Sequence, residues 1–378
     1  MSSLALTASA LLLAACTGCR TGDGPAGSTT ATPGAGPPVA VTSALDTAAA
    51  SVVSPAPRGP VRIGSVDQVA AMLLDDTNVY LFAGVVVSIP KAGGDPRRLD
   101  DRGLEHSTGN IAPGVGPWLA RSGTRILVTA SDEVEQPSTP QATVYWFVDA
   151  TVATVSTSGA APFRLPTRDV EVRGAGADAT WLYWLESGPV SRTRPERLPL
   201  DRLVKMPAAG GAPSVVARDL GRVLGFVIDA TSAYVATLAA GGRGRVLRLP
   251  LAGGASTVMA SDLAWPDEHT TLALDDAYVY WTAGNRLVRV DKSAAVAAAA
   301  TVVNGFEPSW VGDESAYALD ATYVYWTSKA GVQRARKDGS AAPELLVPAA
   351  PTEPLGAIAV DATDVYFTSG SAVLRRTK

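Results

Sequence analysis

The stretch LDDAYVYWT at residues 274–282 returns further along the chain, as LDATYVYWT at 319–327 and as VDATDVYFT at 360–368. Weaker copies begin at Asp75 and at two further aspartates, Asp178 and Asp229. A unit that recurs at a nearly fixed period indicates one supersecondary element repeated along the chain, so the repeat is the first guide to the fold.

The spacing of the copies predicts one further copy, which has diverged in sequence. Successive aspartates lie 103, 51, 46, 45 and 41 residues apart, so the first gap is about twice the others. The segment LARSGTRILVT at residues 119–129 fits inside that gap, with Arg121 in the position of the aspartate. We therefore count seven copies.

Each copy has the pattern of a hairpin followed by further strands. In residues 324–327, Val and Trp alternate with Tyr and Thr, which is the period of a strand with two buried faces. The preceding Asp-Ala-Thr is turn chemistry, because an aspartate accepts hydrogen bonds from backbone N–H groups just after it. A second signature, IPKAGG at 89–94, MPAAGG at 206–211 and LPLAGG at 249–254, predicts another hairpin and a last strand.

These features predict an all-β, seven-bladed β-propeller of four-stranded antiparallel blades over residues 61–378, with six blades as the alternative. The last copy has only three strands, so we expect residues 61–64 to pair with the strand near Leu374 and to close the ring. Val-Tyr-Trp-Thr with its Asp resembles the YWTD-type propellers of extracellular receptors and their bacterial TolB-like relatives, although Ala283 and Ser328 replace the final Asp. That resemblance implies a fold that generally binds proteins.

The first 60 residues have a different composition. Residues 4–15 are an apolar run that is too short to span a bilayer but typical of a signal peptide, which we place at 1–15. Leu-Ala-Ala-Cys at 13–16 resembles the lipobox of bacterial lipoproteins and implies that Cys16 is lipidated; an ordinary signal peptide with an incidental cysteine is the alternative. Residues 16–60 are rich in Gly, Pro, Ser, Thr and Ala and predict a disordered linker. We expect a protein anchored in the bacterial cell envelope, outside the cytoplasm.

Composition removes several classes of function. The formal net charge of −4 gives no support for nucleic-acid binding. The two cysteines, Cys16 and Cys19, both precede the repeats, and His106 and His269 are the only histidines. We therefore expect no cofactor and no metal. The repeated aspartates are interpreted as turn caps, and the aromatic residues of the repeats as packing between blades.

Loops between blades, and loops between the second and third strands, emerge on one face of a propeller, called here the loop face. Two strand two–three loops are long, an acidic one at 132–135 and a basic one at 191–197. Aromatic and arginine side chains dominate interface energies, so this face is the predicted binding site. Its candidate residues are Glu105, His106, Trp118, Arg192, Arg194, Arg197, Trp265, Asp267, Glu268, His269, Glu307, Trp310 and Glu353.

Two functions stay open on this evidence. The first is a monomeric, non-catalytic scaffold that binds a protein or a glycan and is held to a membrane by its lipid. The alternative is a propeller hydrolase or lyase that uses His106 or His269 as a base, with carboxylates around the channel mouth. No Gly-x-Ser-x-Gly elbow and no metal-ligand spacing occurs, which favours the scaffold.

Overall fold

The computed structural model describes residues 59–99, 118–135, 146–157, 163–167, 171–187, 201–238, 243–263, 270–309, 317–350 and 353–378. The chain divides into the units Met1–Ser54 and Pro55–Lys378, and all described residues belong to the second. The predicted signal peptide, Cys16 and nearly all of the predicted linker lie outside the described residues. Within the described ranges, no helix combines the length and the apolar character needed to cross a membrane.

The described residues form seven four-stranded antiparallel sheets, numbered here in chain order. Sheet 1 holds β2 (Ala71–Leu74), β3 (Asn78–Phe82), β4 (Val86–Pro90) and β5 (Arg97–Arg98), and sheet 2 holds β6 (Trp118–Ser122), β7 (Arg125–Glu135), β8 (Trp146–Ser156) and β9 (Phe163–Thr167). Sheet 3 holds β10 (Glu171–Ala177), β11 (Trp181–Ser187), β12 (Arg202–Pro207) and β13 (Ser214–Ala217), and sheet 4 holds β14 (Arg222–Ile228), β15 (Ser232–Leu238), β16 (Gly244–Pro250) and β17 (Thr257–Leu263).

The second half of the ring repeats this order. Sheet 5 holds β18 (Leu272–Leu274), β19 (Tyr278–Thr282), β20 (Arg286–Asp291) and β21 (Ala300–Asn304), and sheet 6 holds β22 (Tyr317–Leu319), β23 (Tyr323–Ser328), β24 (Gly331–Arg336) and β25 (Glu344–Pro348). Sheet 7 holds β26 (Leu355–Val360), β27 (Asp364–Ser369), β28 (Ala372–Thr377) and, as its outer strand, β1 (Val61–Ser65).

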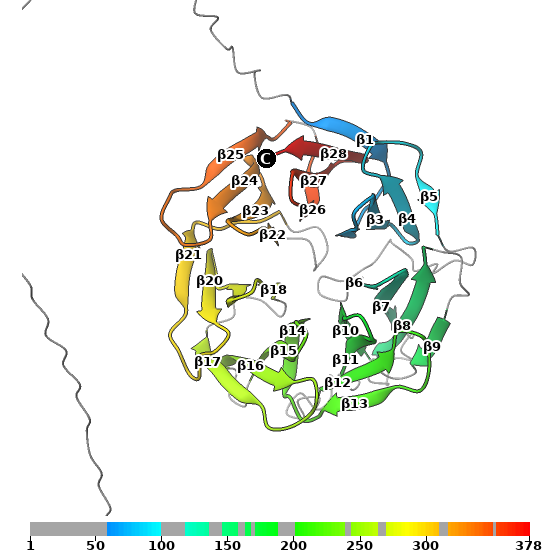
Figure 1. Ribbon diagram of the computed structural model, residues 1–378, viewed down its shortest axis with the longest axis vertical. Coiled ribbons are helices and arrows are strands. Elements are labelled where there is room, and N and C mark those ends of the chain that lie inside the picture. The colour runs from blue at the N-terminus through cyan, green and yellow to red at the C-terminus, as the bar shows by residue number, and fades with distance from the viewer. Residues whose placement is uncertain are drawn as a thin grey trace, which may run out of the picture. The chain divides into compact units, whose positions relative to one another are not determined.

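The sheets of the second unit stand around a common centre, with the first strand of each sheet innermost (Figure 1). This arrangement confirms the predicted propeller of four-stranded antiparallel blades. The copy predicted at 119–129 forms β6 and β7, which turn at Gly123 with Arg121 paired to Ile126. Each repeat therefore builds one sheet, except that the outer strand of sheet 7 is β1.

The ring is closed by hydrogen bonds between the two ends of the unit, as the sequence predicts. β1 pairs with β28 from Val61 opposite Arg375 to Ser65 opposite Ala372, and the pairing continues as Val66 N donates to Ser371 O at 2.8 Å. Pairing these strands removes an open edge from each.

The repeated aromatic residues form the core between the sheets. Trp281 and Tyr280 are both fully buried, but on opposite faces of β19. Trp281 packs with Tyr234 and Val246 of sheet 4, whereas Tyr280 packs with Tyr317 and Trp326 of sheet 6. Each second strand thus buries side chains on both faces, and burial contributes about 1.5–3 kcal/mol for each large apolar side chain.

One predicted loop is a strand. Residues 132–135, predicted to be an acidic loop between the second and third strands, lie inside β7 and pair with β8 from Asp132–Asp149 to Glu135–Trp146. The partner segment begins Trp-Phe-Val at residues 146–148, and such aromatic and β-branched residues favour extended pairing over a turn. The hairpin therefore runs on beyond the length of the other second strands.

Candidate functional site

Six sheets carry an aspartate in the turn between the first and second strands, and its carboxylate caps that turn. In sheet 6, Asp320 Oδ1 accepts hydrogen bonds at 2.7 Å from the backbone N–H groups of Thr322 and Tyr323. The same pair of bonds, at 2.7–3.0 Å, occurs at the other five aspartates, which are Asp75, Asp178, Asp229, Asp275 and Asp361. The interpretation of these residues as turn caps is correct for all six.

The second carboxylate oxygen accepts a hydrogen bond from a tyrosine five residues further on. Tyr280 Oη donates to Asp275 Oδ2 at 2.7 Å, and the other five pairs span 2.6–3.0 Å. The tyrosine ring is buried between sheets, so this bond satisfies a hydroxyl that lies at the end of an apolar contact.

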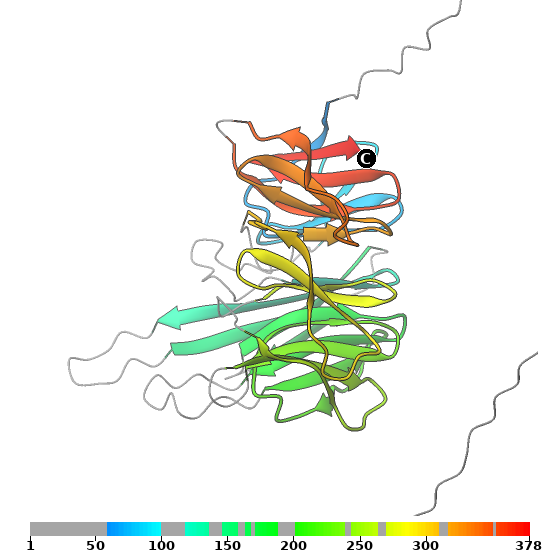
Figure 2. The same cartoon turned by 90° about the vertical axis from the view of Figure 1, so that its left-hand side faces the viewer.

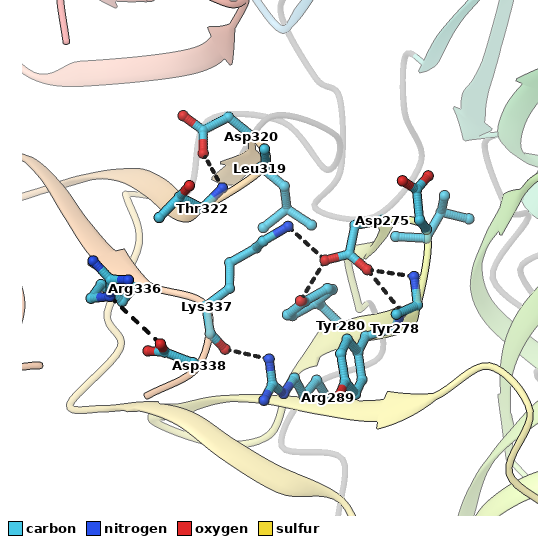
Figure 3. A pocket seen from close by; sticks show the side chains of 14 residues that line it. Asp275, Tyr278, Tyr280, Arg289, Leu319, Asp320, Thr322, Arg336, Lys337 and Asp338 are labelled. Atoms are coloured by element: carbon cyan, nitrogen blue, oxygen red, sulfur yellow. Dashed lines mark hydrogen bonds and ion pairs between the residues drawn. The ribbon is translucent and has the colours of Figure 1, made fainter. Parts of the chain in front are cut away.

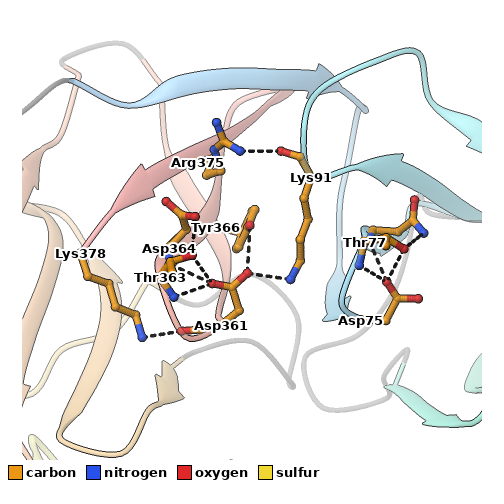
Figure 4. A network of polar contacts seen from close by, with 10 residues as sticks. Asp75, Thr77, Lys91, Asp361, Thr363, Asp364, Tyr366, Arg375 and Lys378 are labelled. Carbon is orange, nitrogen blue, oxygen red and sulfur yellow. Dashed lines mark hydrogen bonds and ion pairs between the residues drawn. The ribbon is translucent and has the colours of Figure 1, made fainter.

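In four of the six cases a lysine from the next sheet completes the group. Figure 4 shows Lys91 of sheet 1 reaching across to Asp361 of sheet 7, with Nζ 2.6 Å from Oδ2. The equivalent pairs are Lys337–Asp275 at 2.6 Å, Lys378–Asp320 at 2.6 Å and Lys292–Asp229 at 3.0 Å. We call each such set an Asp–Tyr–Lys cluster. It joins two neighbouring sheets with a charge-assisted hydrogen bond.

The surroundings fix the protonation state of these groups. Burial raises the pKa of the Asp275 carboxyl, but the hydrogen bonds from Lys337 and Tyr280 outweigh burial and lower it to about 2. Burial and the bond to Asp75 together raise the pKa of the Tyr80 hydroxyl to about 12. Near neutral pH the aspartate stays ionised and the tyrosine stays neutral, so neither is suited to act as a general acid or base.

A groove of about 650 Å³ lies between sheets 5 and 6, on the face that holds the aspartate turns (Figure 3). Lys337 bonds Asp275 across this groove, and Arg289 Nη1 donates to Lys337 O at 2.7 Å while its guanidinium lies 4.1 Å from the Tyr278 ring centre. The remaining lining residues are Leu274, Asp276, Ala277, Tyr280, Leu319, Asp320, Ala321, Thr322, Arg336 and Asp338. Asp275, Lys337 and Arg289 therefore hold the two sheets together across the groove.

Two of the predicted binding residues are described with their surroundings, and both lie at the opposite end of the sheets. Glu353 is exposed just before β26 and accepts a hydrogen bond at 3.1 Å from Ser369 Oγ, at the end of β27 away from the aspartate turn. Glu307 is exposed after β21, next to Phe306, whose backbone N–H donates to Asn285 O at 2.7 Å between the second and third strands of sheet 5. The connectivity argument for the loop face holds for these two residues.

The other predicted residues are not brought together by the described part of the chain. Trp118 begins β6, and only its backbone position is described. The remainder lie outside the described residues: Glu105, His106, Arg192, Arg194, Arg197, Trp265, Asp267, Glu268, His269 and Trp310. In the described ranges no group of three or more His, Cys, Asp or Glu side chains is placed to hold a metal ion.

The lysines of the clusters are the functional feature that sequence reasoning missed. Each lysine follows the aspartate of its own repeat by 16 or 17 residues, as Lys292 follows Asp275. The sequence therefore shows the regular spacing of the lysines. It does not show their bonding partners, because each lysine bonds the aspartate of the preceding sheet and not the aspartate of its own repeat.

Comparisons with known proteins support the fold. The sequence matches no protein-family model and no curated protein. Among solved structures, a catalytically inactive variant of virginiamycin B lyase from Staphylococcus aureus, bound to quinupristin, is 11% identical, with a TM-score of 0.56 over 84% of this chain and 98% of that one. BamB from Moraxella catarrhalis is 14% identical, with a TM-score of 0.45 over 82% and 84% of the two chains. At 11% identity, the likeness to virginiamycin B lyase shows the β-propeller fold alone.

Proposed function

We propose that this chain is a lipid-anchored, extracytoplasmic β-propeller that binds a protein or a glycan on its loop face and catalyses no reaction. The observation that carries the proposal is that the recurrent charged residues are bonded within the fold. All six turn aspartates are bonded to backbone and tyrosine groups of the fold, and four also to lysines. These groups of the turn face, the face that holds the aspartate turns, stabilise the fold. We therefore place recognition on the loop face.

The anchor part of the proposal rests on Leu-Ala-Ala-Cys at 13–16 and on the Gly- and Pro-rich segment that follows. We expect the mature protein to begin at a lipidated Cys16 and to sediment with membranes. Cys16→Ala should release the propeller into the soluble extracytoplasmic fraction, as detected by fractionation and by intact-mass measurement. Membrane association that is unchanged in this variant contradicts the anchor but leaves the binding role open.

The binding part is tested with the full-length protein in detergent, presented to solubilised envelope proteins and to an array of envelope glycans. Glu307→Gln combined with Glu353→Gln changes the loop face, and we expect it to weaken capture about tenfold. Asp76→Asn combined with Asp276→Asn removes the same charge from exposed sites on the turn face and serves as the control. Equal binding by the two variants, or capture of nothing by the wild type, counts against the proposal.

The alternative function, a propeller lyase or hydrolase, is motivated by the structural likeness to virginiamycin B lyase, whose histidine-to-alanine variant is inactive. This chain has two histidines, His106 and His269, on segments predicted to reach the loop face. The purified protein is incubated with quinupristin, and its conversion is followed by chromatography. Conversion by the wild type that is lost in His106→Ala or His269→Ala supports the lyase and contradicts the non-catalytic scaffold.

A further inference from the structure

The hairpin of β7 and β8 extends beyond the rest of its sheet. The two strands pair along their whole length, from Arg125–Ser156 to Glu135–Trp146. β6 accompanies β7 only as far as Thr129, and β9 accompanies β8 only as far as Ala150. Residues 131–135 and 146–149 therefore form a two-stranded ribbon without a neighbouring strand from sheet 2 on either side. Figure 2 shows this ribbon projecting from the sheets.

The ribbon has the geometry that accepts another strand. Both of its long edges carry backbone N–H and C=O groups that no strand of sheet 2 pairs, and such edges are templates for strand addition. A two-stranded ribbon is only marginally stable by itself in water. A third strand supplied by a partner satisfies the edge and stabilises the ribbon at the same time.

The charge of the ribbon indicates which kind of strand it accepts. Its nine residues include four carboxylates, Asp132, Glu133, Glu135 and Asp149, and no lysine or arginine occurs anywhere from residue 126 to 162. The register also places Asp132 directly opposite Asp149. Like charges in directly opposed positions destabilise a strand pair, and a cation placed beside them relieves the repulsion.

We propose that the ribbon of residues 131–135 and 146–149 docks an extended, lysine- or arginine-rich segment of a partner protein, which adds to it as a third strand. The proposal rests on the proposed function only in placing recognition at the loop-face end of the sheets, and it goes further by naming the chemistry of the partner. On β7, Glu133 and Glu135 share one face and Val134 lies on the other, which favours a partner strand in which basic and apolar residues alternate.

The probe is a fluorescent peptide of four Lys-Val repeats, titrated against the full-length protein in detergent at several salt concentrations. The ribbon variant carries Asp132→Asn, Glu133→Gln, Glu135→Gln and Asp149→Asn. The control carries Asp76→Asn, Asp95→Asn, Asp276→Asn and Asp338→Asn, which remove the same net charge from exposed turn-face positions. We expect the Kd to rise about tenfold in the ribbon variant and to stay within about twofold in the control. Equal losses in both variants overturn the proposal, because they indicate only a general attraction to an acidic protein.

Two further measurements separate strand addition from surface attraction. The same peptide, methylated on alternate backbone nitrogens, keeps its charge but cannot pair with an edge, and we expect it to bind about tenfold more weakly. Hydrogen exchange should slow in the amides of 131–135 or 146–149 when the unmethylated peptide is added. Equal affinity of the two peptides, or slowed exchange only elsewhere, overturns the proposal.

The chain itself contains a competing basic segment, with Arg192, Arg194 and Arg197. If this segment is the natural occupant, changing all three arginines to glutamine frees the ribbon and tightens peptide binding, which overturns the external partner. Unchanged or weaker peptide binding in this variant supports it. Failure of the proposal is distinguishable from failure of the proposed function, because glycan or envelope-protein capture through Glu307 and Glu353 is scored in a separate assay.

Discussion

The interfaces around the ring are built in two ways. Sheets 4, 5, 6, 7 and 1 form a continuous arc in which each neighbouring pair is joined by an Asp–Tyr–Lys cluster. The other three interfaces lack such a cluster in the described residues. Thr157, Ala208 and Leu251 occupy the backbone position of the lysine there, since their N–H groups make the same bond to the preceding turn.

Sheet 3 separates two roles that the arc combines, which are the capping of a turn by the aspartate and the joining of two sheets by the lysine. In sheet 3, Asp178 caps its turn and accepts the Tyr183 hydroxyl at 2.7 Å, just as the aspartates of the arc do. Leu251 of sheet 4 takes the place of the lysine there. Lys205 Nζ donates to Leu251 O at 3.2 Å, and the side-chain packing is apolar, with Phe226 packed against Gly174. A side chain at Gly174 would meet the Phe226 ring at 2.6 Å, so the glycine allows this close contact. The aspartate therefore serves the turn everywhere, and the lysine adds a joint between sheets.

The largest effect is expected where the arc is also closed by the chain ends. Removal of residues 1–59 leaves β1 intact and should hardly change the Tm, whereas removal of residues 1–67 deletes β1 and exposes the edge of β28. We expect a fall in Tm on the order of 10 °C for the longer deletion, as the loss of a strand corresponds to several kcal/mol. Calorimetry of the two truncations checks this. Equal melting would mean that β1 contributes nothing to the closure, and that the other contacts between sheets 7 and 1, such as Lys91–Asp361 and Arg375–Lys91, are sufficient.

The next test compares the two kinds of interface directly. Asp275→Ala leaves Lys337, which is 7% exposed, without its counter-ion and should lower the free energy of unfolding by about 3 kcal/mol. Asp178→Ala removes only the turn cap and the tyrosine acceptor and should cost about 1–2 kcal/mol. Denaturant unfolding measures both.

A double-mutant cycle completes this comparison. Lys337→Met in the background of Asp275→Ala should recover part of the lost stability, because no charge is then left buried without a partner. Equal costs for Asp275→Ala and Asp178→Ala, with no coupling in the cycle, would show that the lysine contributes nothing.

Acid should weaken the turns and the arc. Burial raises the pKa of the Asp320 carboxyl, but bonds from Lys378, from backbone N–H groups and from Tyr325 lower it to about 2, against about 3.9 in an unfolded chain. A carboxyl whose pKa is lowered by folding stabilises the fold above the unfolded value, and this stability is lost as the pH falls through the folded value. Unfolding free energy should therefore drop between about pH 4 and pH 2, and the drop should shrink in Asp320→Asn. A profile that is flat over this range in the wild type contradicts the assignment.

The repeat made the fold predictable because each unit carries its own strand alternation and turn chemistry. The turn-capping role of Asp275 and the packing role of Trp281 follow from local sequence alone, and both are confirmed. The bond between Lys337 and Asp275 was not predictable in this way, because it depends on which sheets are neighbours and not on the spacing within one repeat. The charge of residues 132–135 predicts a loop, but the pairing potential of residues 146–148 outweighs that charge and extends the hairpin.

The smallest effect on stability is expected when a lysine is introduced beside Asp178, at the interface between sheets 3 and 4. This change is also the most direct test of the comparison between the two kinds of interface. Leu251 N donates to Thr231 O at 2.9 Å, as Lys337 N donates to Thr322 O at 3.0 Å, so Leu251→Lys starts from an equivalent backbone position and directs an ammonium group towards Asp178. The new pair is offset by the loss of apolar contacts around Leu251, and we expect the unfolding free energy to change by less than about 1 kcal/mol. NMR titration should nevertheless show the pKa of Asp178, already lowered in the wild type, falling further. Ala208→Lys is the matched control, because the residue in the aspartate position of the preceding sheet is Arg121, and this substitution should leave the Asp178 pKa unchanged. A pKa that moves equally in both variants would mean that general charge, and not the joint between sheets 3 and 4, governs Asp178.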